Sequence, residues 1–136
     1  MKVPVRNHPI LSKWLTAKQL PHALLFVGGL LSTKLTNAFE LAQWLLCERE
    51  EACQHCSACK WVMKRTHPDM LCFPNEEDVS IKIDDIRAAI AHLNQSMHQG
   101  KYKIVILAPA EAMPHAAMNA LLKILEEPPA YSLLLL

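Results

Sequence analysis

Two short, continuous apolar runs containing Val or Ile constrain the fold of this chain most strongly. They are HALLFV at residues 22–27 and KIVILA at residues 103–108. Strands buried on both faces of a parallel sheet have this composition, whereas a strand with one wet face alternates apolar and polar residues. Weaker runs of the same kind occur at residues 70–73 and 132–136. We therefore predict four strands in a parallel sheet.

Helical periodicity fills the intervals between these runs. One apolar face groups Leu35, Ala38, Phe39, Ala42, Leu45 and Leu46; a second groups Ile86, Ile90, Leu93 and Met97; a third groups Met118, Leu121, Leu122 and Leu125. Residues three or four apart share one side of a helix, so each face is predicted to pack in the core. Strands alternating with helices indicate an α/β fold with right-handed crossovers.

Polar residues and prolines predict where these helices begin and end. We expect Ser32 or Thr33 to cap the first helix and Asp84 to cap the second. Pro128 is expected to stop the third helix after Glu127.

The length of 136 residues and the hydrophobic content of 51% indicate one domain with a sizeable core. A net charge of +1 gives no sign of a polyanion-binding surface. No apolar run approaches the roughly 20 residues of a membrane span, and the start MKVPVRNHPI lacks a secretory signal. We therefore expect a cytoplasmic protein without membrane contact. The final YSLLLL has no turn or cap, so we expect a fragment of a longer protein that ends on an open strand edge.

Four of the five cysteines are clustered with the spacing C-x5-C-x2-C-x2-C: Cys47, Cys53, Cys56 and Cys59. In a reducing compartment such a cluster indicates metal binding or catalysis rather than disulfides. Four thiolates suit tetrahedral Zn(II) and leave no position for water, which predicts a structural site. Four unrelated buried thiols are the alternative, but the surrounding EREEACQHCSACK is polar.

Residues 47–69 show no steady apolar period. We interpret them as a zinc-module insertion within a domain that covers residues 1–136. His55 is expected to be a solvated neighbour of the ligands, and Cys72 a core residue of the strand at 70–73.

The segment FVGGLLSTKLTN, residues 26–37, matches part of a phosphate-binding loop. In G-x-x-x-x-G-K-[ST], glycines let N–H groups wrap the phosphates, the lysine pairs with them, and the hydroxyl binds Mg(II). Gly28, Gly29 and Lys34 fit this frame. Thr33 stands where glycine is needed and Leu35 where the hydroxyl is needed. The alternative for Lys34 is a solvated side chain in the first turn of a helix.

The second half of such a site is an acidic residue at the end of another buried strand. Here Ala108 and Pro109 follow the run KIVIL, and Glu111 comes only after the proline. The sequence thus predicts a nucleotide site with its frame present and its catalytic groups missing.

Several blocks carry a resemblance to a known family: LPHALLFVGG, the four-cysteine insertion, THPD (66–69), IKIDDIR (81–87), HQGKYKIVILAPAEAM (98–113) and MNALLKILEEPPA (118–130). On these blocks the chain resembles the delta-prime subunits of the bacterial DNA polymerase III clamp loader, in the AAA+ ATPase superfamily. The resemblance implies a P-loop NTPase fold of the RecA-like AAA+ type, a three-layer parallel sheet with helices on both faces, incomplete at its C-terminus.

The same resemblance implies a function. Delta-prime subunits do not hydrolyse ATP; they act as a stator that helps load the sliding clamp onto primed DNA. The implied partners are the gamma or tau and delta subunits, with the clamp and primed DNA reached through the complex. The resemblance also implies that Cys47, Cys53, Cys56 and Cys59 hold structural zinc and that ATP binding is weak or absent.

Two other functions remain open. One is an active ATPase subunit of the gamma or tau type that binds ATP through Gly28, Gly29 and Lys34. The other is a zinc-module protein that binds nucleic acid through CKWVMKR, residues 59–65. We assign no chemistry to THPD, because His67 before a proline is typical of a turn.

Overall fold

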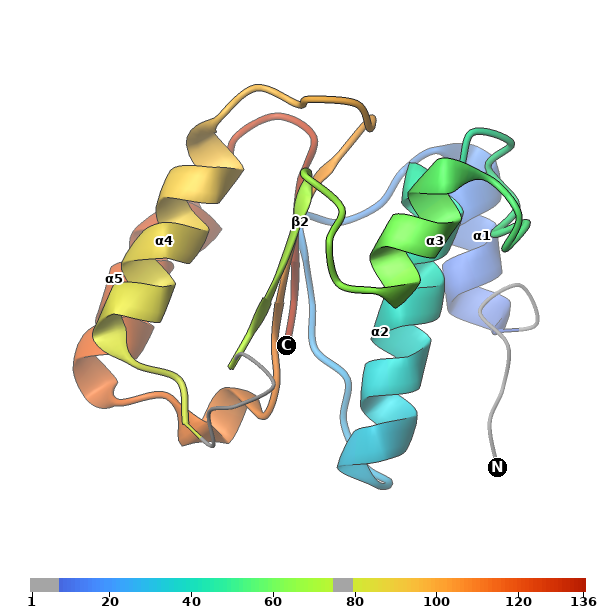
Figure 1. Cartoon of the computed structure of the whole chain (residues 1–136). Helices are drawn as coiled ribbons and strands as arrows, with labels where there is room; N and C mark the ends of the chain where they lie inside the picture. Colours follow the sequence, from blue (N-terminus) through green and yellow to red (C-terminus); the bar gives the residue numbers. More distant parts are fainter. Residues whose placement is uncertain (1–7, 75–79) are drawn as a thin grey trace.

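A parallel sheet lies between two groups of helices in the computed structural model, which describes residues 8–74 and 80–136 (Figure 1). The strands are β1 (Ala23–Leu24), β2 (Met70–Phe73), β3 (Lys103–Leu107) and β4 (Ser132–Leu135). The helices are α1 (Pro9–Ala17), α2 (Leu31–Leu46), α3 (Ser57–Met63), α4 (Ile83–Asn94) and α5 (His115–Glu126), with a short 3-10 turn, η2, at Ala110–Ala112.

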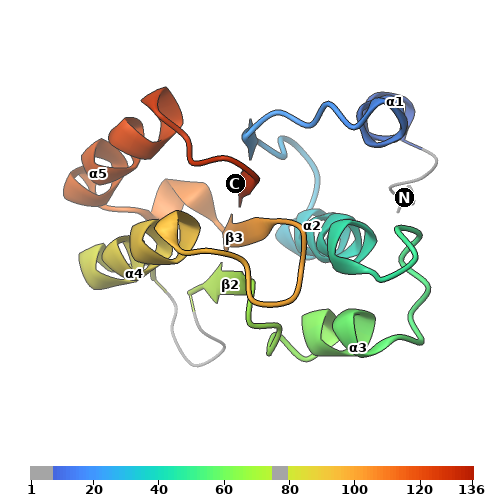
Figure 2. The same ribbon diagram turned by 90° about the horizontal axis from the view of Figure 1, so that it is seen from above.

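The strand order is β1-β4-β3-β2, and every neighbouring pair is parallel. Alternate residues of β3 face opposite layers, so that Ile104 and Ile106 pack toward α2 while Val105 and Leu107 pack toward α4 and α5. Figure 2 shows α4 and α5 on one face of the sheet and α1, α2 and α3 on the other. This burial of both faces is the reason for the continuous apolar runs, and the predicted α/β fold is confirmed.

The strand at the open edge differs from the prediction. The run 22–27 forms only the short β1, although the N–H of Phe26 still donates to the carbonyl of Leu136 at 2.8 Å. Leu25 and Val27 are 65% and 82% exposed instead of buried. In the described residues β1, and not the C-terminal β4, forms this edge, because β4 lies between β1 and β3.

The predicted N-caps are wrong. Helix α2 begins directly after the glycine pair, with Leu30 as its N-cap. Ser32 and Thr33 therefore lie inside the first turn, where neither is the residue before the helix that caps its free N–H groups. Helix α4 has Lys82 as its N-cap, and the carboxylate of Asp85, rather than Asp84, accepts the N–H of Lys82 at 2.9 Å.

Two of the predicted apolar faces also need correction. Helix α4 ends at Asn94, so Met97 is not part of its face and is 37% exposed. Helix α5 buries Ala117, Leu121 and Ile124, a set turned by one residue from the predicted one. Met118 and Leu122 are therefore 38% and 52% exposed. Helix α5 ends at Glu126, one residue before the predicted stop.

Within residues 8–74 and 80–136, no helix has both the length and the apolar character required to cross a membrane.

Candidate functional site: a four-cysteine centre and a glycine loop

The four clustered cysteines come from two helix ends and the loop between them. Cys47 is the C-cap of α2, Cys53 lies in the following loop, Cys56 is the N-cap of α3, and Cys59 lies in the first turn of α3. A helix end fixes the backbone on each side of the loop, so three of the four sulfurs are held by regular structure.

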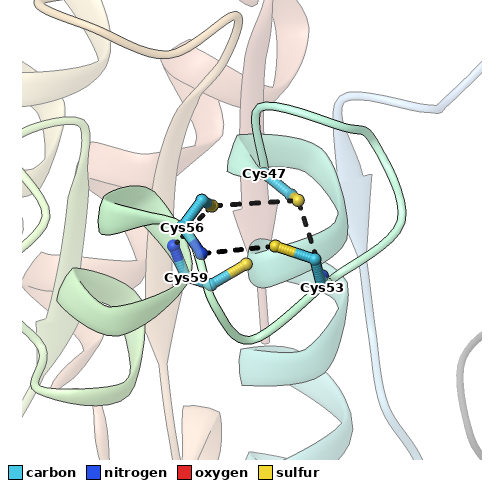
Figure 3. A group of neighbouring side chains, drawn as sticks. All are labelled: Cys47, Cys53, Cys56 and Cys59. Carbon is cyan, nitrogen blue, oxygen red and sulfur yellow. Dashed lines mark hydrogen bonds between the residues drawn. The ribbon is translucent and has the colours of Figure 1, made fainter.

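The four sulfur atoms all lie within 4.8 Å of one another, and Figure 3 shows the side chains pointing toward a common centre. The sulfurs of Cys47 and Cys56 are 3.9 Å apart. A disulfide requires about 2.05 Å between sulfurs, so the cysteines are arranged as separate thiols around one centre. Cys47, Cys53, Cys56 and Cys59, the predicted ligands, are brought together into a group that can hold a metal ion.

Backbone N–H groups point at these sulfurs. Cys47 accepts from the N–H groups of Arg49 at 3.4 Å and Cys53 at 3.5 Å, and Cys53 accepts from those of His55 at 3.4 Å and Cys56 at 3.3 Å. Burial raises the pKa of Cys47, but the N–H donors outweigh it and the pKa falls to about 6. Such donors favour thiolates, the form that binds metal.

Cys59 behaves in the opposite way. Its pKa is raised, first by burial and then by the neighbouring thiols of Cys56 and Cys47. The N–H of Cys59 donates to the sulfur of Cys56 at 3.4 Å, and the pKa of Cys56 is lowered, although burial opposes this. Several thiolates this close repel one another, so a cation at their centre is required for all four to be ionised together.

The loop between Cys47 and Cys56 is tightly turned. Glu50, Ala52 and Gln54 adopt positive φ angles of 55°, 53° and 66°. Each left-handed residue other than glycine costs about 1–2 kcal/mol. A ligand that binds all four sulfurs would offset this cost, because it ties both ends of the loop to one point.

The four-cysteine segment packs on α2 rather than standing apart. Ala58, Cys59 and Val62 of α3 are buried, and the side-chain amide of Gln43 donates to the carbonyl of Cys59 at 3.3 Å. Arg65 lies over the ring of Phe39 at 4.9 Å from its centroid. The segment is therefore continuous with the core layer that contains α2.

His55, Cys72 and the stripe at residues 59–65 lie outside the group of four sulfurs except for Cys59, which belongs to both. His55 is exposed and its side chain does not join the group of four sulfurs. Cys72 lies in β2 and packs against the core on the α2 side. In the stripe 59–65, Trp61 is half-buried, with its ring 5.8 Å from that of His67. Trp61 and Arg65 are thus partly occupied by contacts within the protein.

The glycine loop follows β1 at the carboxyl edge of the sheet. Gly28 and Gly29 both have positive φ angles, 79° and 69°, which explains the need for glycine there. Helix α2 starts at Leu31, and the N–H of Lys34 already donates to the carbonyl of Leu30 at 3.1 Å. The residues between the glycines and the lysine are therefore mostly helical instead of forming an extended loop.

One of the two pockets near this loop is small and mostly apolar. A pocket of about 40 Å³ lies between the start of α2 and the ends of β3 and β4, and its lining includes Lys34, Leu35, Ala108, Pro109 and Glu111. Leu35 packs against the core on the α2 side. Glu111 is exposed within η2. This pocket offers the volume of a water molecule or two rather than that of a triphosphate.

A larger pocket of about 350 Å³ adjoins the loop on its other side. Its lining includes His8, Trp14, Gly28, Lys34 and Asn37. Helix α1 forms one wall of this pocket. Helix α1 was not predicted from the sequence, although Pro9 at the first helical position and the apolar spacing of Leu11, Trp14 and Leu15 are signals for it.

A buried polar cluster centred on THPD was also not predicted from the sequence. Asp69 and Lys103 are 0% and 1% exposed, and Nζ of Lys103 lies 3.0 Å from Oδ1 of Asp69. The carboxylate of Asp69 accepts the N–H groups of His98, Gln99 and Gly100 at 2.7, 2.8 and 2.6 Å. These donors hold the pKa of Asp69 well below its usual range, although burial opposes them.

His67 belongs to the same cluster. Its Nδ1 accepts the N–H of Asp69 at 3.0 Å, and burial lowers the pKa of the ring. THPD does form a turn, as predicted, but its aspartate anchors the segment 98–100 to the start of β2. A lysine at the head of the apolar run KIVILA was the signal for a buried partner.

A family model described as DNA polymerase III, delta subunit, matches residues 6–136. Among curated relatives, the DNA polymerase III subunit delta-prime of Pseudomonas aeruginosa is 40% identical over 122 residues, which cover 87% of this chain and 37% of the relative. The Bacillus subtilis protein of the same name is 35% identical over 112 residues, which cover 81% of this chain and 34% of the relative. The chain thus spans about a third of the length of these relatives.

A solved structure has the same fold. The gamma subunit-related protein of DNA polymerase III from Thermotoga maritima is 28% identical, with a TM-score of 0.68 over 91% of this chain and 37% of that chain. The predicted AAA+ type of fold is confirmed by this likeness. Because the family match covers residues 6–136, the chain belongs to the DNA polymerase III delta-subunit family, and its curated relatives are delta-prime subunits.

Proposed function

We propose that this chain is the nucleotide-binding-like domain of a non-catalytic clamp-loader subunit, a stator that helps place the sliding clamp on primed DNA. The domain is taken as residues 1–136 with residues 47–69 as an insertion. The delta-prime names of its relatives support the role. Its partners in this proposal are the gamma or tau and delta subunits, and it reaches the clamp and DNA through the complex. This role assigns the protein to the cytoplasm.

The observation that carries the proposal is the early start of α2 at Leu31, which leaves Lys34 inside a helix and Leu35 against the core. Because Leu35 has no hydroxyl, it offers no ligand to Mg(II). Ala108 and Pro109 offer no carboxylate at the end of β3. We therefore interpret Gly28, Gly29 and Lys34 as a vestigial phosphate loop. The N-terminus of α2 still has free N–H groups, so weak anion binding without hydrolysis fits this interpretation.

A reconstituted clamp loader tests the stator role. The variant is Lys34→Ala in this subunit. The matched control changes the corresponding lysine in a gamma-type subunit. The comparison shows whether the loop of this chain has a structural or a catalytic role. We expect Lys34→Ala to leave ATP hydrolysis and clamp loading by the complex unchanged, while the control abolishes both. Loss of hydrolysis on Lys34→Ala, with the complex still assembled, would contradict a non-catalytic role.

An active ATPase subunit is the second candidate, because the solved structure with this fold is described as gamma subunit-related. The pocket of about 350 Å³ beside the loop also has room for part of a nucleotide. The missing hydroxyl and carboxylate favour the stator. The same Lys34→Ala experiment decides between them.

We propose Zn(II) as the metal of the four-cysteine centre. A tetrahedral Zn(II) site with Zn–S bonds of about 2.3 Å places its sulfurs about 3.8 Å apart, and the sulfurs of Cys47 and Cys56 are 3.9 Å apart. Cys53 and Cys59 complete the set, which leaves no open position and so implies a structural ion. Elemental analysis of protein purified without chelator should find one zinc per chain, and metal-free folded protein would refute the assignment.

A further inference from the structure

A second pocket of about 350 Å³ lies at the amino edge of the sheet, opposite the glycine loop. Lys101 and Tyr102 line it just before β3, and Tyr131 lines it just before β4. Parallel strands begin at one edge and end at the other, so this pocket is separate from the glycine loop after β1. Nothing in the proposed stator mechanism uses it.

The walls of this pocket are apolar and aromatic. Leu15, Leu20 and Leu45 contribute aliphatic surface to the lining, and Trp44 contributes an indole ring. Tyr102 and Tyr131 pack edge to face with ring centroids 6.2 Å apart. Tyrosine and tryptophan are the side chains that most often anchor protein interfaces.

Tyr131 is held beside the pocket by a turn before β4. The N–H of Ser132 closes this turn by donating to the carbonyl of Pro129 at 3.3 Å, and the carbonyl of Tyr131 accepts the N–H of Lys103 at 2.9 Å. The turn accounts for the positive φ of 59° at its third residue. It leaves the side chain of Tyr131 64% exposed and beside Tyr102.

Charges at the pocket favour an acidic ligand. Lys18 and Lys101 line it together with a single carboxylate, that of Glu50. The ammonium group of Lys101 pairs with Glu50, and Lys18 is close enough to act on the same carboxylate. Two ammonium groups therefore share one carboxylate, which leaves an excess of one positive charge beside the aromatic rings.

A protein segment suits this lining better than a nucleobase. A nucleobase that lies against the leucine surface buries its hydrogen-bonding edge there without a partner, which is costly, whereas the polar groups of the lining belong to other side chains. The phenyl ring of phenylalanine has no such edge. The volume is within the range in which a pocket encloses a small organic group.

We propose that this pocket docks a segment of a partner protein in which an aromatic side chain enters between the tyrosines and the leucines and an adjacent carboxylate pairs with Lys18 and Lys101. The class of partner is thus an acidic peptide with an aromatic anchor. This docking site is independent of the vestigial phosphate loop, and the test below does not depend on clamp loading.

Three capped tripeptides test the proposal on the full, metal-loaded chain: Asp-Phe-Asp, Lys-Phe-Lys and Asp-Ala-Asp. Binding is followed by NMR through the indole of Trp44 and the rings of Tyr102 and Tyr131. We expect saturable shifts with Asp-Phe-Asp and an affinity at least about tenfold higher than for either of the other two. Equal binding of the three peptides, or no shift with any of them at millimolar concentration, would overturn the proposal.

Variants locate the binding. Tyr131→Ala and Lys18→Glu should each weaken Asp-Phe-Asp by about tenfold, while Lys13→Glu, a matched exposed lysine outside the pocket lining, should have no effect. Metal content and melting temperature show whether each variant is folded. If Tyr131→Ala does not fold, Lys18→Glu provides the test. Thymidine monophosphate serves as a further probe. If it moves the same signals at lower concentration than the peptide, the pocket is a nucleotide site and the proposal is wrong.

Discussion

The ammonium nitrogen of Lys103 lies 3.0 Å from a carboxylate oxygen of Asp69, and both side chains are completely or almost completely buried. The pair joins the beginning of β3 to the residue before β2. Three N–H groups of the segment 98–100 complete the shell around the carboxylate. One buried ion pair thus fixes the start of two neighbouring strands and the connection that leads into β3.

Asp69→Asn should be strongly destabilising. It leaves Lys103 buried without a counter-charge, and breaking a buried pair in this way costs about 3–5 kcal/mol. Urea unfolding at neutral pH measures the change. Asp84→Asn is the matched control, because Asp84 pairs with Arg87 at 3.1 Å on the surface and such exposed pairs contribute about 0.2–1 kcal/mol. Similar losses in the two variants would contradict the role given to the buried pair.

The same carboxylate should make stability depend on acid pH. The pKa of Asp69 is held below its usual value, so its contribution is present above the unfolded pKa of about 3.9 and is lost as the pH falls toward the folded pKa. Urea midpoints measured from about pH 5 to pH 3 should fall steeply for the wild type and less steeply for Asp69→Asn. Metal released by acid acts on both proteins, so the difference between their slopes is the informative quantity. Parallel slopes would show that the pKa of Asp69 is the same in the folded and the unfolded protein.

Gly100→Ala should destabilise the fold through a clash. A Cβ at this position would lie 2.5 Å from the Cδ2 of Leu46 and 3.3 Å from the Oδ2 of Asp69. Overpacking of this kind typically costs about 1–3 kcal/mol. Thermal unfolding checks the loss. Gly29→Ala provides a contrast, because its added Cβ meets nothing within 4 Å and only the positive φ of 69° opposes the substitution. A larger loss of melting temperature for Gly29→Ala than for Gly100→Ala would contradict the clash.

Replacement of one of the four proposed zinc ligands should release the ion. Cys59→Ser is expected to abolish stoichiometric zinc and lower the melting temperature, because the remaining thiols no longer close a four-coordinate site. Cys72→Ser is the control, since Cys72 lies in β2 outside the group of four sulfurs. Zinc content and melting temperature are read on the same samples. Retention of one zinc by Cys59→Ser together with its loss from Cys72→Ser would reverse the assignment.

Much of the fold could be predicted because its signals are local. The runs at residues 70–73 and 103–108 correspond closely to β2 and β3, and the cysteine spacing predicted a compact group of four sulfurs. In each case neighbouring residues carry the whole pattern. The start of α2 was harder to predict, because Ser32 and Thr33 are good caps in isolation but the glycine pair already turns the chain before them.

The rest depends on contacts between distant parts of the chain. Asp69 and Lys103 lie far apart in the sequence, and although a lysine at the head of an apolar run suggests a buried partner, the partner is identified only once the strands are paired. The rotation of α5 is similar: Leu122 has the apolarity of a core residue, but Ala117 and Ile124 face the core instead. Periodicity gives the width of an apolar face and leaves its exact orientation to packing.

Titration of the purified chain with MgATP tests the central claim most directly. In the proposed stator, Leu35 packs against the core where a phosphate loop has a magnesium-binding hydroxyl, and Ala108 and Pro109 follow β3 where an ATPase has a carboxylate. Calorimetry should show at most weak binding that does not depend on Mg(II), and a phosphate-release assay should show no turnover above background. Tight, Mg(II)-dependent binding, or turnover that disappears on Lys34→Ala, would contradict the account.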